Sequence, residues 1–186
     1  MLLDLAKSRR TVRKFKSEGF PVDKIIRCIE VAKEAPSGIN KQPWYFLIVK
    51  DPEKKREIRR RCEKFERNLH RRVRGELKEW MEKENITWRK DFLEEAPYLV
   101  MIFSDIRAPY SRESTWLAVG YFLLALEEEG LSSLTYTPPP AREIAEMVNA
   151  PRYYRLETIL PVGYPKDGGR KKRRKELQEI MGFDSF

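Results

Sequence analysis

The stretch Tyr98-Leu99-Val100-Met101-Ile102-Phe103 is apolar at every position and rich in aromatic and β-branched residues. Such a run is typical of a strand that is buried on both faces. Residues 44–49 have the same character, and further strands are predicted over 132–137 and 156–161. Because helical segments separate these four strands, the sequence predicts an α/β or α+β sheet sandwiched between helices.

The predicted helices carry apolar residues at intervals of three and four positions. The segment from Pro52 to Glu84 is strongly charged, yet it keeps one apolar stripe. This pattern predicts one or two long helices whose charged face is exposed to solvent. Residues 113–129 are apolar almost all round, so we expect them to form the central helix. Shorter helices are predicted over 2–7, from Pro21 to Pro36, and over 142–148.

The composition excludes several classes of protein. The chain has 186 residues, of which 41% are hydrophobic, so it suits one domain and is not wholly disordered. No apolar run is long enough to span a membrane and no signal-peptide pattern is present, so we expect a cytoplasmic protein. Cys28 and Cys62 are then expected to be reduced, and a single histidine, His70, argues against a His-rich metal centre.

The net charge of +9 is concentrated in an unbroken run of six basic residues, Arg170 to Lys175. A second basic segment is Arg9-Arg10-Thr11-Val12-Arg13, whose guanidinium groups can form bidentate hydrogen bonds with a phosphate. Either cluster could instead be an ordinary solvated face, and the run at 170–175 also suits salt-sensitive binding to nucleic acid. No GxGxxG loop, P-loop or nucleophile elbow is present, which disfavours a protein-only acid–base enzyme.

The loop Ala35-Pro36-Ser37-Gly38-Ile39-Asn40-Lys41-Gln42-Pro43-Trp44 offers hydrogen-bonding groups to a polar heterocycle, although by itself it also suits an ordinary turn. Together with residues 9–13 and the closing segment 160–165, it resembles the nitroreductase family of flavin mononucleotide (FMN) oxidoreductases. Within that family the chain is similar to the iodotyrosine deiodinase branch, in the segments 50–54, 85–90, 133–138 and 173–181.

The resemblance implies an α+β fold, a nitroreductase-like sandwich in which a mostly antiparallel sheet of four to five strands is flanked by helices. It also implies an intertwined homodimer with FMN at the interface. Residues 1–165 would form the FMN-binding domain, and residues 166–186 a basic C-terminal extension that wraps the dimer and contacts the FMN phosphate.

The resemblance also assigns FMN-binding residues. These are Arg9, Arg10, Thr11, Arg13, Pro36, Ser37, Gly38, Gln42, Thr135, Tyr136, Thr137 and Arg174. The basic segment and Arg174 would hold the phosphate and ribityl chain, whereas the Pro-Ser-Gly loop would reach the flavin of the partner chain. Thr137 is the candidate catalytic residue, since its hydroxyl would hydrogen-bond flavin N5 as donor or acceptor; its other interpretation is a threonine packed at a strand end.

For the substrate, the deiodinase branch recognises the zwitterion of a halotyrosine with a Glu, a Tyr and a Lys. Glu66 and Lys90 fall at the Glu and Lys positions, whereas His70 stands where the branch has Tyr. Ile39 completes the predicted substrate-binding set. Glu66 and His70 are four residues apart on one helix face and can converge on a ligand. The alternative is that Glu66 and His70 belong to the solvent-exposed face of the charged helix.

These expectations lead to one main function and two alternatives. The main one is an FMN-dependent oxidoreductase that passes electrons from NAD(P)H to a small organic acceptor, a nitro compound or a quinone, with no metal. The first alternative is a reductive dehalogenase of halotyrosine-like substrates, which Glu66, Lys90 and Thr137 favour. The distant alternative is a nucleic-acid-binding protein that uses the basic run at 170–175.

Overall fold

The sheet has three antiparallel strands in the order β1-β2-β3. The computed structural model, which describes residues 1–168 and 173–185, has β1 at Trp44–Val49, β2 at Tyr98–Asp105 and β3 at Tyr154–Val162. The central strand is β2, where Met101 lies opposite Leu47 on β1 and Ile159 on β3. The antiparallel pairing confirms the α+β fold class.

The predicted strand over 132–137 is interrupted. It forms two isolated bridges, one between Ser132 and Gly163, the residue after β3, and one between Tyr136 and Ile159 of β3. The register places Leu134 opposite Pro161 between them, and a proline has no N–H to donate to the ladder. The sheet therefore has three regular strands and an irregular fourth, where four to five regular strands were predicted.

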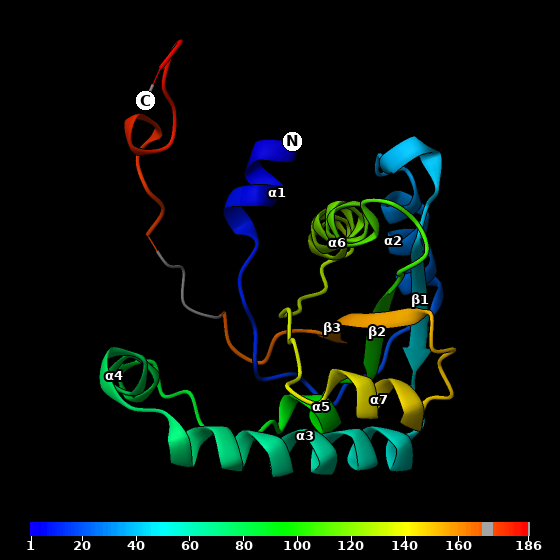
Figure 1. Ribbon diagram of the computed structural model, residues 1–186, viewed down its shortest axis with the longest axis vertical. Helices are drawn as coiled ribbons and strands as arrows, with labels where there is room; N and C mark the ends of the chain where they lie inside the picture. The colour runs from blue at the N-terminus through cyan, green and yellow to red at the C-terminus, as the bar shows by residue number, and fades with distance from the viewer. Residues whose placement is uncertain (169–172, 186) are drawn as a thin grey trace.

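Helices cover both faces of the sheet (Figure 1). The α-helices are α1 (Leu2–Ser8), α2 (Asp23–Lys33), α3 (Pro52–Arg72), α4 (Gly75–Lys83), α5 (Phe92–Glu95), α6 (Ser111–Glu128) and α7 (Ala141–Met147), with 3-10 turns η1 (Gly38–Asn40) and η2 (Leu177–Glu179). Alternate residues of β2 face two separate cores. Val100 and Ile102 contribute to the core beneath α2 and α6, whereas Leu99 and Met101 contribute to the core beneath α3, α5 and α7.

The long charged segment forms two helices. The Asp51 carboxylate caps α3 by accepting a hydrogen bond from Lys54 N at 2.7 Å, and Pro52 starts the first turn. The break comes at Val73 and Arg74, which are extended, and Gly75 follows with a φ of +63°. Glycine adopts this left-handed conformation without steric penalty, so α4 can leave α3 in a new direction.

Two strongly apolar segments, α6 and β1, are partly exposed in the single chain. On α6, Leu117 and Tyr121 are 48% and 40% exposed, although the opposite side of the helix packs on the core. The prediction that residues 44–49 are fully buried is wrong for the isolated chain, because β1 lies at the edge of the sheet and Tyr45 is 51% exposed. Apolar surface therefore remains on α6 and β1.

The C-terminal residues 173–185 run away from the sheet and are exposed throughout (Figure 1). Arg170, Lys171 and Lys172 of the predicted basic run lie outside the described residues. Across residues 1–168 and 173–185, no helix combines the length and the apolar character that crossing a bilayer requires.

Candidate functional site

The N-terminal basic segment runs beside the interrupted strand. Thr11 and Ser133 form a parallel bridge, and Val12 N donates a hydrogen bond to Ser133 O at 3.1 Å. The Val12 side chain is buried in the core, which anchors the segment, while the Arg13 side chain is exposed. The fold thus brings the predicted phosphate-binding residues 9–13 next to the predicted flavin-ring residues 135–137.

Arg9, Arg10 and Arg174 share one electropositive region. Burial lowers the pKa of the Arg9 guanidinium, the positive charges of Arg174 and Arg10 lower it further, and the carboxylate of Glu127 opposes them. The Arg9 Nη1 also donates a hydrogen bond to the backbone oxygen of Arg10 at 3.2 Å. An anion relieves the repulsion between such guanidinium groups, so the region suits a phosphate.

The side chains of residues 135–137 alternate across the interrupted strand. Thr135 and Thr137 are exposed, and within the described ranges neither hydroxyl has a hydrogen-bond partner. Tyr136 points the other way, into the core beneath α3, where its hydroxyl donates to Glu66 Oε1 at 2.9 Å. Thr135 and Thr137 can therefore present hydroxyls to a ligand, whereas the Tyr136 hydroxyl lies on the opposite side of the strand and its backbone groups are bonded to Ile159.

The loop around Gly38 is braced against the start of α6. Gly38 N donates to the Ser114 hydroxyl at 3.1 Å, and a Cβ at Gly38 would lie only 2.8 Å from the Tyr110 ring. The Ser37 hydroxyl accepts a hydrogen bond from Gln42 N at 3.0 Å. Ile39 has a φ of +45°, which is strained for a β-branched residue, and its side chain is exposed.

This loop is remote from the other predicted cofactor residues of the same chain. Figure 1 places η1, which contains Gly38 and Ile39, far from the segment that follows α1 and leads past residues 9–13. Pro36, Ser37 and Gln42 belong to the same loop. One chain alone therefore does not unite these residues with Thr137.

The predicted substrate-binding residues Glu66, His70 and Lys90 do come together. Glu66 is 6% exposed and Lys90 is 6% exposed, and Glu66 Oε2 lies 3.2 Å from Lys90 Nζ. The same oxygen lies 3.6 Å from His70 Nε2. Glu66 is thus not part of the solvent-exposed face of α3, although the neighbouring Arg67 and Arg71 are exposed. The result is a buried pair of opposite charges beside a neutral hydroxyl, that of Tyr136.

Burial also sets the protonation of the groups around this pair. It lowers the pKa of His70, the positive charge of Lys90 lowers it further, and the Glu66 carboxylate opposes both. His70 Nε2 is buried and has no hydrogen-bond partner in the described part of the chain. Burial raises the pKa of the Cys62 thiol to about 12, so this cysteine, like Cys28, stays protonated. Neither cysteine forms a disulfide.

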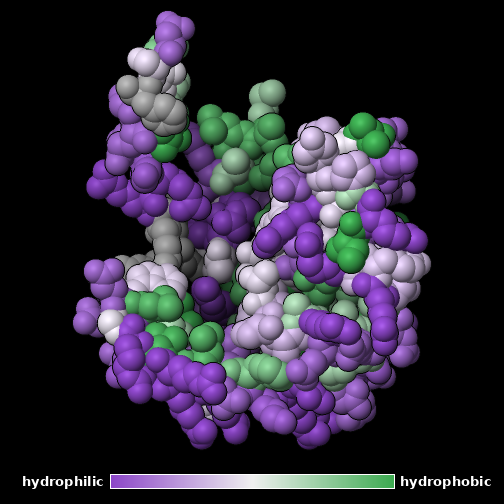
Figure 2. Space-filling model, viewed as in Figure 1, coloured by the Kyte–Doolittle hydropathy of each residue, from purple (hydrophilic) through white to green (hydrophobic). Residues whose placement is uncertain are grey.

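A cleft of about 1200 Å³ opens between residues 13–18 and residues 84–92. Arg13 and Lys90 both line it, so it extends from the end of the basic segment to Lys90. Figure 2 shows the molecule hollowed between the part that carries α4 and the rest, with hydrophilic side chains in the hollow. Across the described residues, no group of His, Cys, Asp and Glu side chains is arranged to hold a metal ion.

A family model fits most of the chain, since the model of the nitroreductase family matches residues 6–164. The chain belongs to the nitroreductase family. It falls in the iodotyrosine deiodinase-like branch, for it is 56% identical to the iodotyrosine deiodinase of Thermotoga neapolitana over 186 residues, covering 100% of this chain and 99% of that protein. The iodotyrosine deiodinase of Haliscomenobacter hydrossis is 36% identical over 93% of this chain and 84% of its own length.

Two solved structures share the fold. An oxidized iodotyrosine deiodinase bound to FMN and 3-iodo-L-tyrosine superimposes with a TM-score of 0.97 at 56% identity, over 100% of both chains. A BluB-like flavoprotein from Clostridium difficile 630 superimposes with a TM-score of 0.83 at 25% identity, over 100% of this chain and 99% of that chain.

Sequence reasoning missed three contributors to this nitroreductase-family site. Ser114 braces the Gly38 loop, and Arg59 and Glu63 hold the residues around Lys90. The spacing of Arg59 and Glu63 on one helix predicts an ion pair between them. It does not predict that Glu63 also binds the backbone of Lys90. The orientation of the Tyr136 side chain was available from sequence, because successive residues of an extended strand point to opposite faces.

Proposed function

We propose that this chain is a homodimeric FMN-dependent enzyme that reductively removes halide from halotyrosine-like amino acids. The observation that carries the proposal is the buried Glu66–Lys90 pair beside the cleft. The sequence similarity to iodotyrosine deiodinases supports it. Both therefore favour the dehalogenase over the nitro or quinone reductase that was the main expectation.

The pair is complementary to the zwitterion of an amino acid. An incoming ammonium group takes the place of Lys90 beside Glu66, and the incoming carboxylate takes the place of Glu66 beside Lys90. Charge balance is kept at every stage, so neither buried charge is left unpaired, which would be strongly unfavourable. A phenol without the amino acid group offers no such exchange and should bind poorly.

FMN suits the residues of the basic region. Arg9, Arg10, Thr11 and Arg13 would hold its phosphate and ribityl chain, with Arg174 on the same phosphate. The lowered pKa of Arg9 fits this assignment, because a phosphate dianion offsets the repulsion among these cations. Thr135 and Thr137 would lie along the flavin ring, and the hydroxyl of Thr137 can donate or accept a hydrogen bond there.

A second copy of the chain would supply the loop that a single chain holds away from this site. Pro36, Ser37, Gly38 and Gln42 would contact the partner's flavin, and Ile39 would border the substrate. The half-exposed Leu117 and Tyr121 on α6 offer apolar surface for such an interface. Residues 166–186 would then extend over the partner chain.

Bound FMN supplies the electrons of the reaction, taken from a reduced nicotinamide, which we propose as the donor. Two electrons and one proton convert the aryl–halogen bond to an aryl–hydrogen bond, and the halogen leaves as halide. The chain's own residues act by binding and orientation: Glu66 and Lys90 hold the amino acid group, and Thr137 holds the flavin edge. The basic run would serve the cofactor through Arg174, which leaves nucleic-acid binding without support.

The experiment compares two substrates of the enzyme loaded with FMN. Iodide release from 3-iodo-L-tyrosine and from 2-iodophenol is measured with the same reductant. We expect 3-iodo-L-tyrosine to be favoured at least about 100-fold in kcat/KM, because the iodophenol lacks both charged groups. Equal efficiency for the two compounds, or faster reduction of a nitro compound or quinone than of either, contradicts the proposal.

A further inference from the structure

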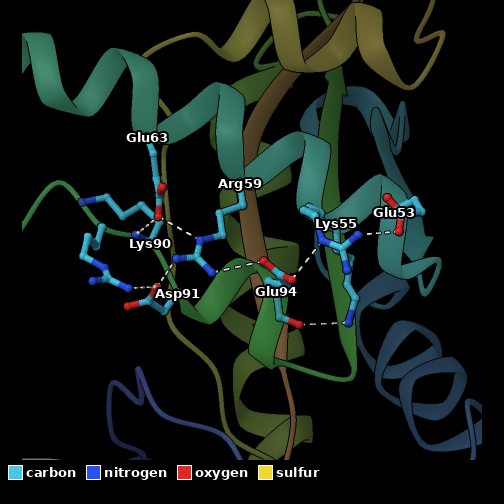
Figure 3. Close-up of polar contacts among 9 residues, drawn as sticks. Glu53, Lys55, Arg59, Glu63, Lys90, Asp91 and Glu94 are labelled. Carbon is cyan, nitrogen blue, oxygen red and sulfur yellow. Dashed lines mark hydrogen bonds and ion pairs between the residues drawn. The ribbon is translucent and has the colours of Figure 1, made fainter.

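Glu63 holds the main chain of Lys90 onto α3 (Figure 3). Lys90 N donates a hydrogen bond to Glu63 Oε1 at 2.9 Å. The same oxygen accepts from Arg59 Nε at 2.8 Å, one turn earlier on the helix. Glu63 is 9% exposed, so water competes little for its carboxylate. The main chain at Lys90 is thereby tied to a helix that belongs to the core.

Arg59 extends this connection to the residues that follow Lys90. Its Nη1 donates to Glu94 Oε2 at 3.1 Å, and its Nη2 donates to the Asp91 carboxylate. One guanidinium thus binds carboxylates on α3, on α5 and on the residue next to Lys90 (Figure 3). A planar guanidinium with several fixed donors can hold such an arrangement, which the single ammonium of a lysine cannot.

The other end of Lys90 is held separately. Its Nζ donates to Thr87 O at 2.7 Å and lies 3.2 Å from Glu66 Oε2. Leu93 N donates to Lys90 O at 2.9 Å, which sets Lys90 at the start of α5. The contacts that hold Lys90 thus come from α3, from α5 and from Thr87, which lies between α4 and α5.

We propose that Arg59 and Glu63 are positioning residues for substrate recognition, which act by fixing the main chain of Lys90 so that its ammonium group stays within reach of the substrate carboxylate. This inference rests on the proposed function, since it assigns Lys90 to the substrate carboxylate. A lysine that is already ordered loses less conformational freedom on binding, so pre-organisation strengthens affinity. Without the Glu63 contact, each binding event has to order Lys90 and its neighbours anew.

The competing explanation is that Arg59 and Glu63 only tie α5 to α3. Lys55 gives α5 an independent anchor, because its Nζ donates to Ala96 O at 2.7 Å and to Glu94 O at 3.2 Å. Phe92 and Leu93 of α5 are also buried in the core. Loss of Glu63 should therefore leave α5 in place and disturb mainly Lys90, so a variant at this position remains interpretable.

The test is a double-mutant cycle on the full chain loaded with FMN, in which 3-iodo-L-tyrosine is titrated and the flavin absorbance is followed. Glu63→Ala should weaken binding about tenfold in the wild-type background and leave it unchanged when Lys90→Ala is already present. Glu63→Gln keeps an oxygen that can accept from Lys90 N and should recover most of the affinity. FMN affinity and kcat at saturating substrate should stay within about twofold of wild type.

The matched control is Glu143→Ala, which removes a carboxylate that also pairs with an arginine of α3, Arg61 at 2.9 Å, but does not touch Lys90. It should leave binding unchanged. If Lys90→Ala weakens binding and Glu63→Ala does not, the positioning role is refuted and the proposed function stands. Additive losses in the cycle also refute it. If Lys90→Ala binds the ligand as wild type does, the recognition in the proposed function itself fails.

Discussion

Glu66 Oε2 lies 3.2 Å from Lys90 Nζ, and each of the two residues is only 6% exposed. The other oxygen of Glu66 accepts the Tyr136 hydroxyl at 2.9 Å. Buried ion pairs contribute little to stability compared with apolar residues of similar size, because both charges lose their hydration. A role in ligand binding therefore explains the presence of a buried ion pair here better than a role in stability does.

The first prediction concerns the charge of Glu66. Glu66→Gln keeps an oxygen for the Tyr136 hydroxyl but removes the partner of the substrate ammonium. We expect the KM for 3-iodo-L-tyrosine to rise about 10- to 100-fold while FMN content stays the same. Glu143→Gln serves as the control on an exposed ion pair of α3. An unchanged KM in steady-state iodide release would refute the assignment of Glu66.

The second prediction concerns Arg9. Arg9→Gln should weaken FMN binding about tenfold or more, measured by flavin fluorescence, because one phosphate contact is lost. Without FMN, the same variant should unfold at a temperature no lower than wild type, since the repulsion from Arg174 and Arg10 is relieved. Arg27→Gln, which removes a surface arginine paired with Glu129, should leave FMN affinity unchanged.

The third prediction concerns the close approach at Gly38. Gly38→Ala places a methyl group 2.8 Å from Tyr110 and 3.2 Å from the backbone oxygen of Pro109, so the loop has to move. We expect a loss of about 1–3 kcal/mol in the free energy of unfolding and weaker FMN binding. Gly19→Ala, with open space around the added methyl, is the control. Native stability and FMN affinity in Gly38→Ala would show that the loop plays no part in the site.

The fourth prediction concerns pH. The pKa of His70 is lowered from its ordinary value of 6.5, chiefly by burial, so the unfolded chain binds this proton more readily than the folded chain. The stability that His70 contributes is therefore present above about pH 6.5 and is lost as the pH falls through the lower folded value.

Urea unfolding between about pH 7 and pH 5 checks this sign. The free energy of unfolding should decline more steeply for the wild type than for His70→Asn, which has no proton to gain. Parallel pH profiles for the two proteins would show that another group is responsible.

The sequence predicts the layered α+β fold because the apolar strands and amphipathic helices are individually clear. The strand at 98–103 and the helix stripe after Pro52 are found where expected. The interruption at Leu134 and Pro161 depends on which residues face each other across the sheet. The sequence of one strand does not show with which residues it pairs. The exposure of Leu117 likewise depends on which side of α6 packs on the core, and a helix that is apolar almost all round does not indicate that side.

Sequence motifs predicted part of the spatial arrangement of the candidate site, although the roles of its residues stay predictions. The meeting of Glu66, His70 and Lys90 and the approach of residues 9–13 to 133–137 follow the family resemblance. The resemblance gave no sign of how deeply Glu66 is buried, nor of its bond to the Tyr136 hydroxyl. Both depend on packing between α3 and a strand distant in the sequence.

Reductive dehalogenation can be followed in a single turnover without oxygen. The enzyme loaded with FMN is reduced, the excess reductant is removed, and 3-iodo-L-tyrosine is added; iodide and tyrosine are then measured. We predict that iodide and tyrosine appear in equal amounts, each matching the reduced flavin, as the flavin is reoxidised. Flavin that stays reduced, with no iodide released from a fully loaded enzyme, would contradict it.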